Sequence, residues 1–233
     1  MAWDFSTDPD FQTELDWMRH FVDEQLIPLE LLIHGLNQAE LDALWAPLKQ
    51  VVKERGPWAA HLEPEHGGQA PVGETGGQQR LALMHEILGR SELAPEIFGC
   101  QGPDSGNAEL IAVGATEAQK ERWLYPLLRS EIRSAFCLTE PHTSGSDPTG
   151  IATRCEREGD EWVLNGEKWF SSNASVADIL VVMCVTDPEA PPHKRAAMVI
   201  VPKGTSGLEL VRDVPTMHHP GEVAEDFLMD RIG

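Results

Sequence analysis

The apolar residues in the first half of the chain recur every three or four positions, the period of an amphipathic helix. Between residues 10 and 26 this pattern predicts one helix, and Pro28 is expected to end or bend it. A second helix is predicted to begin at Asn37, because Asn37 and Glu40 have the spacing of a capping box. Gly56 is expected to end that helix.

Three further segments before residue 130 have helical spacing. They are residues 78–90, a short stretch that ends at Gly114, and a stretch that follows Thr116. Thr116 and Gln119 again have the spacing of a capping box, which predicts where the last of these helices begins. Residues 1–130 are therefore predicted to form an N-terminal α-helical domain.

After Ser130 the pattern changes to alternation of apolar and polar residues, which is typical of β-strands. Asn165-Gly166 is predicted to be a hairpin turn between two of the strands. Seven short strands with turn residues between them indicate an antiparallel β-barrel or sandwich, so the predicted fold class is α+β, with residues 131–233 as the second domain. The candidate strands are 134–139, 151–158, 161–164, 167–171, 178–185, 196–201 and 207–211.

The charge and composition of the chain limit the classes of molecule that it is expected to bind. The formal net charge of −20 would repel nucleic acid and anionic membrane surfaces, so neither is an expected partner. No apolar run is long enough to span a membrane, and the first residues resemble neither a signal nor a transit peptide, which predicts a cytoplasmic protein. The four cysteines show no C-x-x-C spacing and are predicted to be buried free thiols, with no metal site.

Two stretches carry candidate chemistry. The first, residues 136–147, is Phe-Cys-Leu-Thr-Glu-Pro-His-Thr-Ser-Gly-Ser-Asp, an apolar strand followed by a loop rich in hydroxyl groups. Backbone N–H groups around Ser144-Gly145-Ser146 can face an anion, so this loop suits a phosphate group. The second, residues 165–174, is Asn-Gly-Glu-Lys-Trp-Phe-Ser-Ser-Asn-Ala. Each motif alone is most often only a strand end with a turn, or a hairpin.

Together, in this order and spacing, the two motifs resemble the flavin-binding middle domain of the acyl-CoA dehydrogenases. The run from Gly106 to Leu128 also resembles the last helices of that family's N-terminal domain. The resemblance implies an FAD-dependent oxidoreductase of fatty acid metabolism that desaturates an acyl-CoA thioester and transfers hydride to N5 of FAD. It also implies an acyl-CoA substrate, an electron-transfer flavoprotein or similar acceptor, and a homo-oligomer.

The resemblance further implies which residues would meet the flavin. Main-chain groups of Phe136 and Leu138 and the hydroxyl of Thr139 would address the pyrimidine edge, and Phe170 would cover one face. The strand Phe170-Ser171-Ser172 would lie beside the isoalloxazine, with Ser172 near N5. Gly145 and Ser146 would hold the pyrophosphate or the acyl-CoA. Because the protein is acidic, the anionic ester would need local donors such as Arg154, Lys168 or backbone amides.

The chain also departs from the family pattern. Family members usually take the catalytic base, a glutamate, from a C-terminal four-helix domain, so the chain is expected to be incomplete and no catalytic residue is assigned. The loop between Glu140 and Gly145 is one residue longer than in most relatives, and Phe170 stands where many have tryptophan. A non-catalytic binding or assembly module with the same fold, or an acyl-CoA oxidase, remain alternative interpretations.

Overall fold

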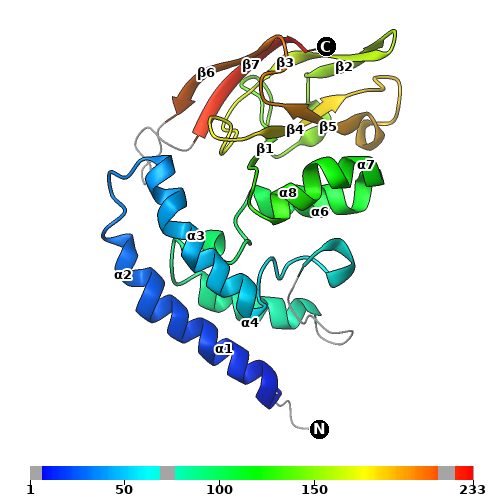
Figure 1. The fold of residues 1–233 in the computed structure, drawn as a ribbon. Helices are drawn as coiled ribbons and strands as arrows, with labels where there is room; N and C mark the ends of the chain where they lie inside the picture. Colours follow the sequence, from blue (N-terminus) through cyan, green and yellow to red (C-terminus); the bar gives the residue numbers. More distant parts are fainter. Residues whose placement is uncertain (1–6, 69–76, 215–223, 233) are drawn as a thin grey trace. The chain divides into compact units, whose positions relative to one another are not determined.

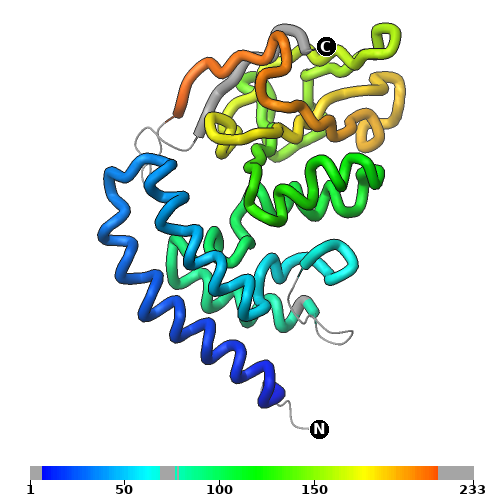
Figure 2. Tube along the Cα trace, in the orientation of Figure 1, coloured from blue at the N-terminus to red at the C-terminus, as the bar shows by residue number. Residues whose placement is uncertain are grey.

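The structure is a computed structural model that describes residues 7–68, 77–214 and 224–232. The chain divides into two compact units, Met1–Ser105 and Gly106–Gly233. Along the chain, helices come first and strands follow (Figures 1 and 2).

The first helix of the N-terminal unit extends past the predicted end. Helix α1, Pro9–Phe21, begins where a side-chain oxygen of Asp8 accepts a hydrogen bond from the Phe11 N–H group. It continues through a π-helical segment, Val22–Leu26, into α2, Ile27–Glu30. Pro28 does not stop the helical path, because it lies in the first turn of α2, where a proline is tolerated.

Helix α3, Gln38–Arg55, confirms the predicted capping box. The Asn37 N–H group donates to Glu40 Oε2 at 2.8 Å, and the Glu40 N–H group donates to Asn37 Oδ1 at 3.1 Å. Gly56 ends the helix with a φ of 119°, a left-handed conformation that glycine adopts at little cost. The unit also contains a 3-10 turn, Pro64–His66, and helices α4, Gly77–Leu88, and α5, Ala94–Ile97.

The core of this unit is apolar and partly aromatic. Phe21 and Phe98 pack edge to face with ring centroids 6.0 Å apart, and Trp17 stacks on Phe21 at 5.3 Å. Fully or almost fully buried residues of the unit include Met18, Val22, Leu26, Val52, Ile87, Leu88, Ile97 and Phe98. Among the helices in the described ranges, none combines the length and apolar character needed to cross a membrane.

Short helices lead into the sheet of the second unit. Helix α6, Asp104–Gly114, is followed by α7, Glu117–Gln119, a π-helical segment, Lys120–Leu124, and α8, Tyr125–Leu128. The predicted capping box at Thr116 is present. The change from helix to strand falls between Leu128 and Ser134, whereas the division into compact units falls earlier and groups most of α6 with the sheet. One contact that joins them is the hydrogen bond from Asn107 Nδ2 to Ser134 Oγ, 2.8 Å.

The sheet is open and mixed, with the order β1-β4-β2-β3-β7-β6 and with β5 beside β4 (Figure 1). Most neighbours are antiparallel, but β4 runs parallel to β1 and meets β2 in parallel. The predicted fold class, helices followed by a β domain, is confirmed. The strands are β1, Ser134–Cys137; β2, Arg154–Glu158; β3, Glu161–Lys168; β4, Ile179–Val185; β5, Ala196–Pro202; β6, Leu208–Val214; and β7, Ala224–Ile232; 3-10 turns occupy Pro148–Gly150 and Pro192–Lys194.

The hairpin predicted at Asn165-Gly166 is wrong. Strand β3 continues through both residues to Lys168, and its pairing with β7 shifts register between Leu164 and Gly166. A Cβ atom on Gly166 would lie 2.3 Å from Thr153 Oγ1. The glycine is therefore required for a close approach of Thr153 to the strand and not for a turn.

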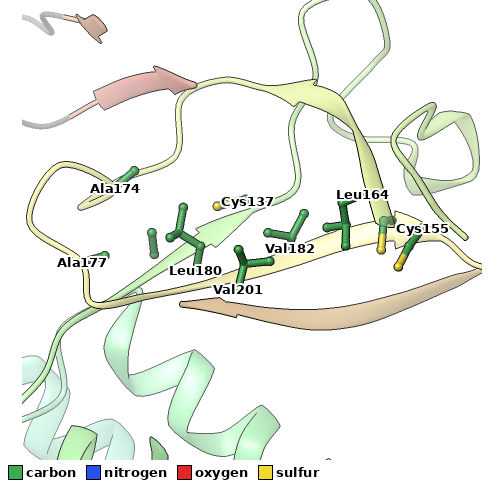
Figure 3. Packing of buried hydrophobic residues seen from close by; sticks show 10 residues of the cluster. Cys137, Cys155, Leu164, Ala174, Ala177, Leu180, Val182 and Val201 are labelled. Atoms are coloured by element: carbon green, nitrogen blue, oxygen red, sulfur yellow. The ribbon is translucent and has the colours of Figure 1, made fainter. Parts of the chain in front are cut away.

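Apolar side chains from several strands form the core of the sheet, as Figure 3 shows for β1, β2, β3, β4 and β5. Leu164, Leu180, Val182 and Val201 are its larger members, and the smaller ones are Cys137, Cys155, Cys184, Ala135, Ala174 and Ala177. All four cysteines of the chain are free and buried, which confirms the prediction from their spacing. Burial raises the pKa of the Cys137 thiol to about 12.

Candidate functional site

The two sequence motifs meet where β1 and β3 end. The Trp169 N–H group donates a hydrogen bond to the Thr139 carbonyl at 3.1 Å, and Lys168 Nζ donates to the Leu138 carbonyl at 2.9 Å. Two strands, β4 and β2, separate β1 from β3 in the sheet. The sheet must therefore curl to bring these two ends together.

A buried polar network joins the two ends. Glu140 Oε1 accepts hydrogen bonds from Lys168 Nζ at 2.8 Å, from Thr153 Oγ1 at 2.5 Å and from the Thr153 N–H group at 2.9 Å. Its other oxygen accepts from the Ala152 N–H group at 2.7 Å. The exposed fractions are 0% for Lys168, 4% for Glu140 and 1% for Thr153. The network thus links three segments of the chain out of contact with solvent.

The network also shifts the titration of its two charged groups. Burial raises the pKa of the Glu140 carboxyl, but the hydrogen bonds from Lys168, Thr153 and Ala152 outweigh burial and hold the pKa below its ordinary value. Burial lowers the pKa of the Lys168 ammonium, and the hydrogen bond to Glu140 opposes this shift. The carboxylate form of Glu140 is therefore favoured at neutral pH, opposite the ammonium of Lys168.

Beyond Lys168 the chain presents an aromatic ring to the surface. Phe170 is 49% exposed, and its φ of 51° is unusual for a residue with a large side chain. Its ring lies 4.6 Å from that of Trp169, and Asn173, three residues later, has a φ of 70°. Backbone strain of this kind is concentrated at functional sites, so the exposed ring is a candidate contact for a planar ligand.

The loop after Glu140 lies against the end of β1. A Cβ atom on Gly145 would lie 3.1 Å from both Thr139 Cγ2 and Thr139 Oγ1, so a larger residue would crowd Thr139. Ser144 Oγ and Ser146 Oγ are 2.9 Å apart and exposed. Asp147 Oδ1 accepts from the N–H group of Thr149 at 3.0 Å and from its hydroxyl at 2.6 Å, which closes the loop. The loop therefore offers small polar groups beside Thr139.

The structure places Leu138, Thr139 and Gly145 close to the segment that leads to Phe170. A Cβ atom on Gly145 would contact Thr139. The Thr139 carbonyl accepts a hydrogen bond from the N–H group of Trp169, the residue before Phe170. Phe136 and Leu138 are partly buried in and just after β1, and Gly145, Ser146 and Ser172 are exposed.

Two predicted residues have limited access to a ligand. Ser171 is 0% exposed, which leaves only its main chain for a ligand at the surface, and the Leu138 carbonyl already accepts a hydrogen bond from Lys168.

The interpretation of Lys168 as a donor to an anionic ester is wrong, because its ammonium is buried against Glu140. Arg154, in β2, has an exposed side chain.

Sequence reasoning did not assign a role to Glu140 or Thr153. Glu140 carried no clear signal, because a charged residue where a strand gives way to a turn is ordinarily exposed to solvent. Thr153 carried no signal either. Its contact with Glu140 depends on a glycine thirteen positions further along the chain, at Gly166.

The comparisons with known proteins indicate one family. Residues 135–229 match the family described as acyl-CoA dehydrogenase, middle domain. The chain is 40% identical over 168 residues to acyl-CoA dehydrogenase family member 11 of Mus musculus. It is also 40% identical over 171 residues to "Probable acyl-CoA dehydrogenase FadE2" of Mycobacterium tuberculosis. A solved structure from Mycobacterium abscessus, assigned to the acyl-CoA dehydrogenases, is 33% identical and superposes with a TM-score of 0.84.

The matches cover most of this chain but only part of each relative. The shares of this chain are 71%, 72% and 98% for the mouse, M. tuberculosis and M. abscessus proteins, whereas the shares of those proteins are 20%, 40% and 59%. The matched family segment contains both motifs and the network that joins them. On the combined evidence of sequence, fold and site, the chain belongs to the acyl-CoA dehydrogenase family.

Proposed function

We propose that this chain provides the flavin-binding and acyl-CoA-binding part of an FAD-dependent acyl-CoA dehydrogenase, which desaturates the α,β bond of an acyl-CoA thioester. The observation that carries the proposal is that Thr139, at the end of β1, lies next to both Gly145 and Trp169, the residue before the exposed Phe170. Family membership supports the same conclusion. Each part of this region offers a different kind of contact.

The residues present fit a flavin. The exposed ring of Phe170 can cover one face of a planar ring system, and the exposed hydroxyl of Ser172 can donate to a ring nitrogen. The hydroxyl of Thr139 and main-chain groups of Phe136 and Leu138 would address the polar edge of that ring system. When bound, FAD would supply the acceptor for the hydride that leaves the β carbon of the substrate.

Gly145 and Ser146 would hold phosphate groups. Both are exposed in a loop that contains small residues and hydroxyl groups, and the carboxylate of the nearby Asp147 is engaged by Thr149. Backbone N–H groups and hydroxyl groups of such a loop can donate hydrogen bonds to phosphate oxygens. The role of this chain would thus be to bind and orient cofactor and substrate, and the residue that removes the α proton is not assigned.

The proposal includes an electron-transfer flavoprotein or a similar electron acceptor. It also includes assembly into a homo-oligomer. A cytoplasmic location remains a prediction from the sequence.

The first test is an absorbance and fluorescence titration of the purified protein with FAD. We expect bound yellow chromophore in the wild type and weaker retention or a shifted spectrum in Ser172→Ala, with Ser206→Ala as a control at an exposed serine after β5. Equal flavin content and spectrum in Ser172→Ala would remove the assignment of Ser172. A folded wild type that binds no FAD would favour the non-catalytic module, and enoyl-CoA formation with bound FAD would establish the enzyme.

A further inference from the structure

The two chain segments that would meet the flavin are not held together by strand pairing. Strands β1 and β3 are separated by β4 and β2 in the sheet, and both end before the residues of interest. The contacts between their ends are the Trp169 to Thr139 hydrogen bond and the bonds made by Lys168. Something other than the regular ladder therefore has to set their mutual position.

We propose that Lys168, Glu140 and Thr153 form a positioning network that fixes Thr139 relative to Phe170 and Ser172 for flavin binding. The inference rests on the proposed function, since it concerns the same surface. None of the three side chains touches the surface itself, because all three are buried. They act through the residues next to them.

Lys168 makes hydrogen bonds to the residues directly before and directly after Thr139 in the chain. Its ammonium bonds to the carbonyl of Leu138, the residue before Thr139, and to the carboxylate of Glu140, the residue after it. Lys168 also directly precedes Trp169, whose N–H group bonds to Thr139 itself. Directional hydrogen bonds at three consecutive residues leave the end of β1 little freedom to slide along the end of β3.

Glu140 connects the hydrogen bonds of Lys168 to a third segment of the chain. Its two oxygens accept four hydrogen bonds, two from Thr153 and one each from Ala152 and Lys168. The carboxylate is thus well satisfied, as a buried charge must be. Because a buried ion pair often stabilises no more than an apolar pair of similar volume, its presence at this point of the fold favours a role in positioning.

The shape of β3 supports the same role independently. At Gly166 the strand has no side chain, and Thr153 occupies the space that a Cβ would need, with Oγ1 2.3 Å from that position. The register shift in the pairing of β3 with β7 occurs next to this glycine. The strand is therefore built to admit Thr153, whose hydroxyl then reaches Glu140.

The experiment compares wild type with the double variant Lys168→Met/Glu140→Leu, which replaces the ion pair with apolar side chains of similar size. Two quantities are measured on folded protein: hydrogen exchange of the Trp169 amide and the dissociation constant for FAD. Lys203→Met is the matched control, because Lys203 Nζ also donates to a main-chain carbonyl, that of Ser175 at 2.6 Å, but is exposed.

We expect exchange at Trp169 to accelerate by at least about tenfold in the double variant while the β4 amides from Ile179 to Cys184 keep their protection, because the lost hydrogen bonds lie at the ends of β1 and β3 and at Ala152 and Thr153. The affinity for FAD should fall by a comparable factor, and neither quantity should change in Lys203→Met. Unchanged exchange at Trp169 together with unchanged FAD affinity in the folded double variant would overturn the proposal. A loss of protection spread evenly over β4 would also overturn it, in favour of a purely structural role.

A milder pair of variants keeps the test decisive if the double variant does not fold. Thr153→Val removes one donor to Glu140 at nearly constant volume, and Thr153→Ser keeps the hydroxyl. Faster exchange at Trp169 in Thr153→Val but not in Thr153→Ser supports positioning, and equal exchange in both contradicts it. If the wild type binds no FAD, the proposed function fails, whereas the exchange at Trp169 still decides whether the network positions these segments.

Discussion

The ammonium of Lys168 lies 2.8 Å from a carboxylate oxygen of Glu140, and the two residues are 28 positions apart in the chain. Neither is exposed by more than 4%. The pair joins the ends of two strands that are not neighbours in the sheet. The contribution of this pair to the unfolding free energy and the titration of Glu140 can each be tested separately from flavin binding.

Removal of one partner should destabilise the protein more than removal of both. Lys168→Met leaves the Glu140 carboxylate buried without its ion-pair partner, and such changes cost about 3–5 kcal/mol of unfolding free energy. The double variant Lys168→Met/Glu140→Gln should cost less, because no unpaired charge remains and the amide oxygen of the new side chain can still accept from N–H groups that donate to Glu140. Denaturant unfolding of the variants measures both values. A double variant less stable than Lys168→Met would contradict this account.

Stability at acid pH should depend on Glu140. Its folded pKa lies below the ordinary value of 4.5, so the unfolded chain binds more protons in the window between the two values. The contribution of Glu140 is therefore complete above about pH 4.5 and is lost as the pH falls through the folded pKa. Unfolding free energies of wild type and Glu140→Gln, measured from pH 7 to pH 3, should converge as the pH falls. Parallel curves would show that Glu140 does not titrate differently in the two states.

Local sequence signals predicted the elements whose causes are local. The capping boxes at Asn37 and Thr116 formed as expected, because every group in them lies within three residues. Asn165-Gly166 failed as a turn because the need for glycine came from Thr153, a contact made only in the folded sheet. The pairing of Lys168 with Glu140 could not be predicted for the same reason. It forms only in the folded sheet, and a charged residue within a strand pattern does not indicate which residue it pairs with.

The two motifs, in contrast, were predicted to lie close together, because in this order and spacing they resemble the middle domain of the acyl-CoA dehydrogenases. The structure places Thr139 and Trp169 within hydrogen-bond distance. What the pattern could not give was the direction of each side chain: Lys168 is buried and Phe170, two positions later, is exposed, although the regular strand predicted for 167–171 would place both on the same face. Strand β3 ends at Lys168, and the left-handed backbone at Phe170 breaks the alternation.

Gly166→Ala should destabilise the sheet. The new Cβ would lie 2.3 Å from Thr153 Oγ1 and must displace Thr153 from Glu140, so we expect a loss of about 1–3 kcal/mol, the usual cost of overpacking. Gly114→Ala is the matched control, because nothing lies within 4 Å of the added atom. Thermal unfolding of both variants checks the prediction. A Gly166→Ala protein as stable as Gly114→Ala would show that Thr153 can move at no cost.

Phe170→Gly should separate stability from binding. Glycine adopts the φ of 51° freely, which relieves strain of about 1–3 kcal/mol, but it also gives the unfolded chain more freedom, at a cost of about 0.5–1 kcal/mol. The net change in unfolding free energy should therefore be small or favourable. Trp162→Gly is a suitable comparison, because Trp162 is 50% exposed but lies within strand β3, where glycine is unfavourable. We expect Trp162→Gly to lower stability and leave FAD affinity unchanged, and Phe170→Gly to lower FAD affinity without loss of stability. If Phe170→Gly destabilises the protein as much as Trp162→Gly does, the ring packs in the fold and does not serve the ligand.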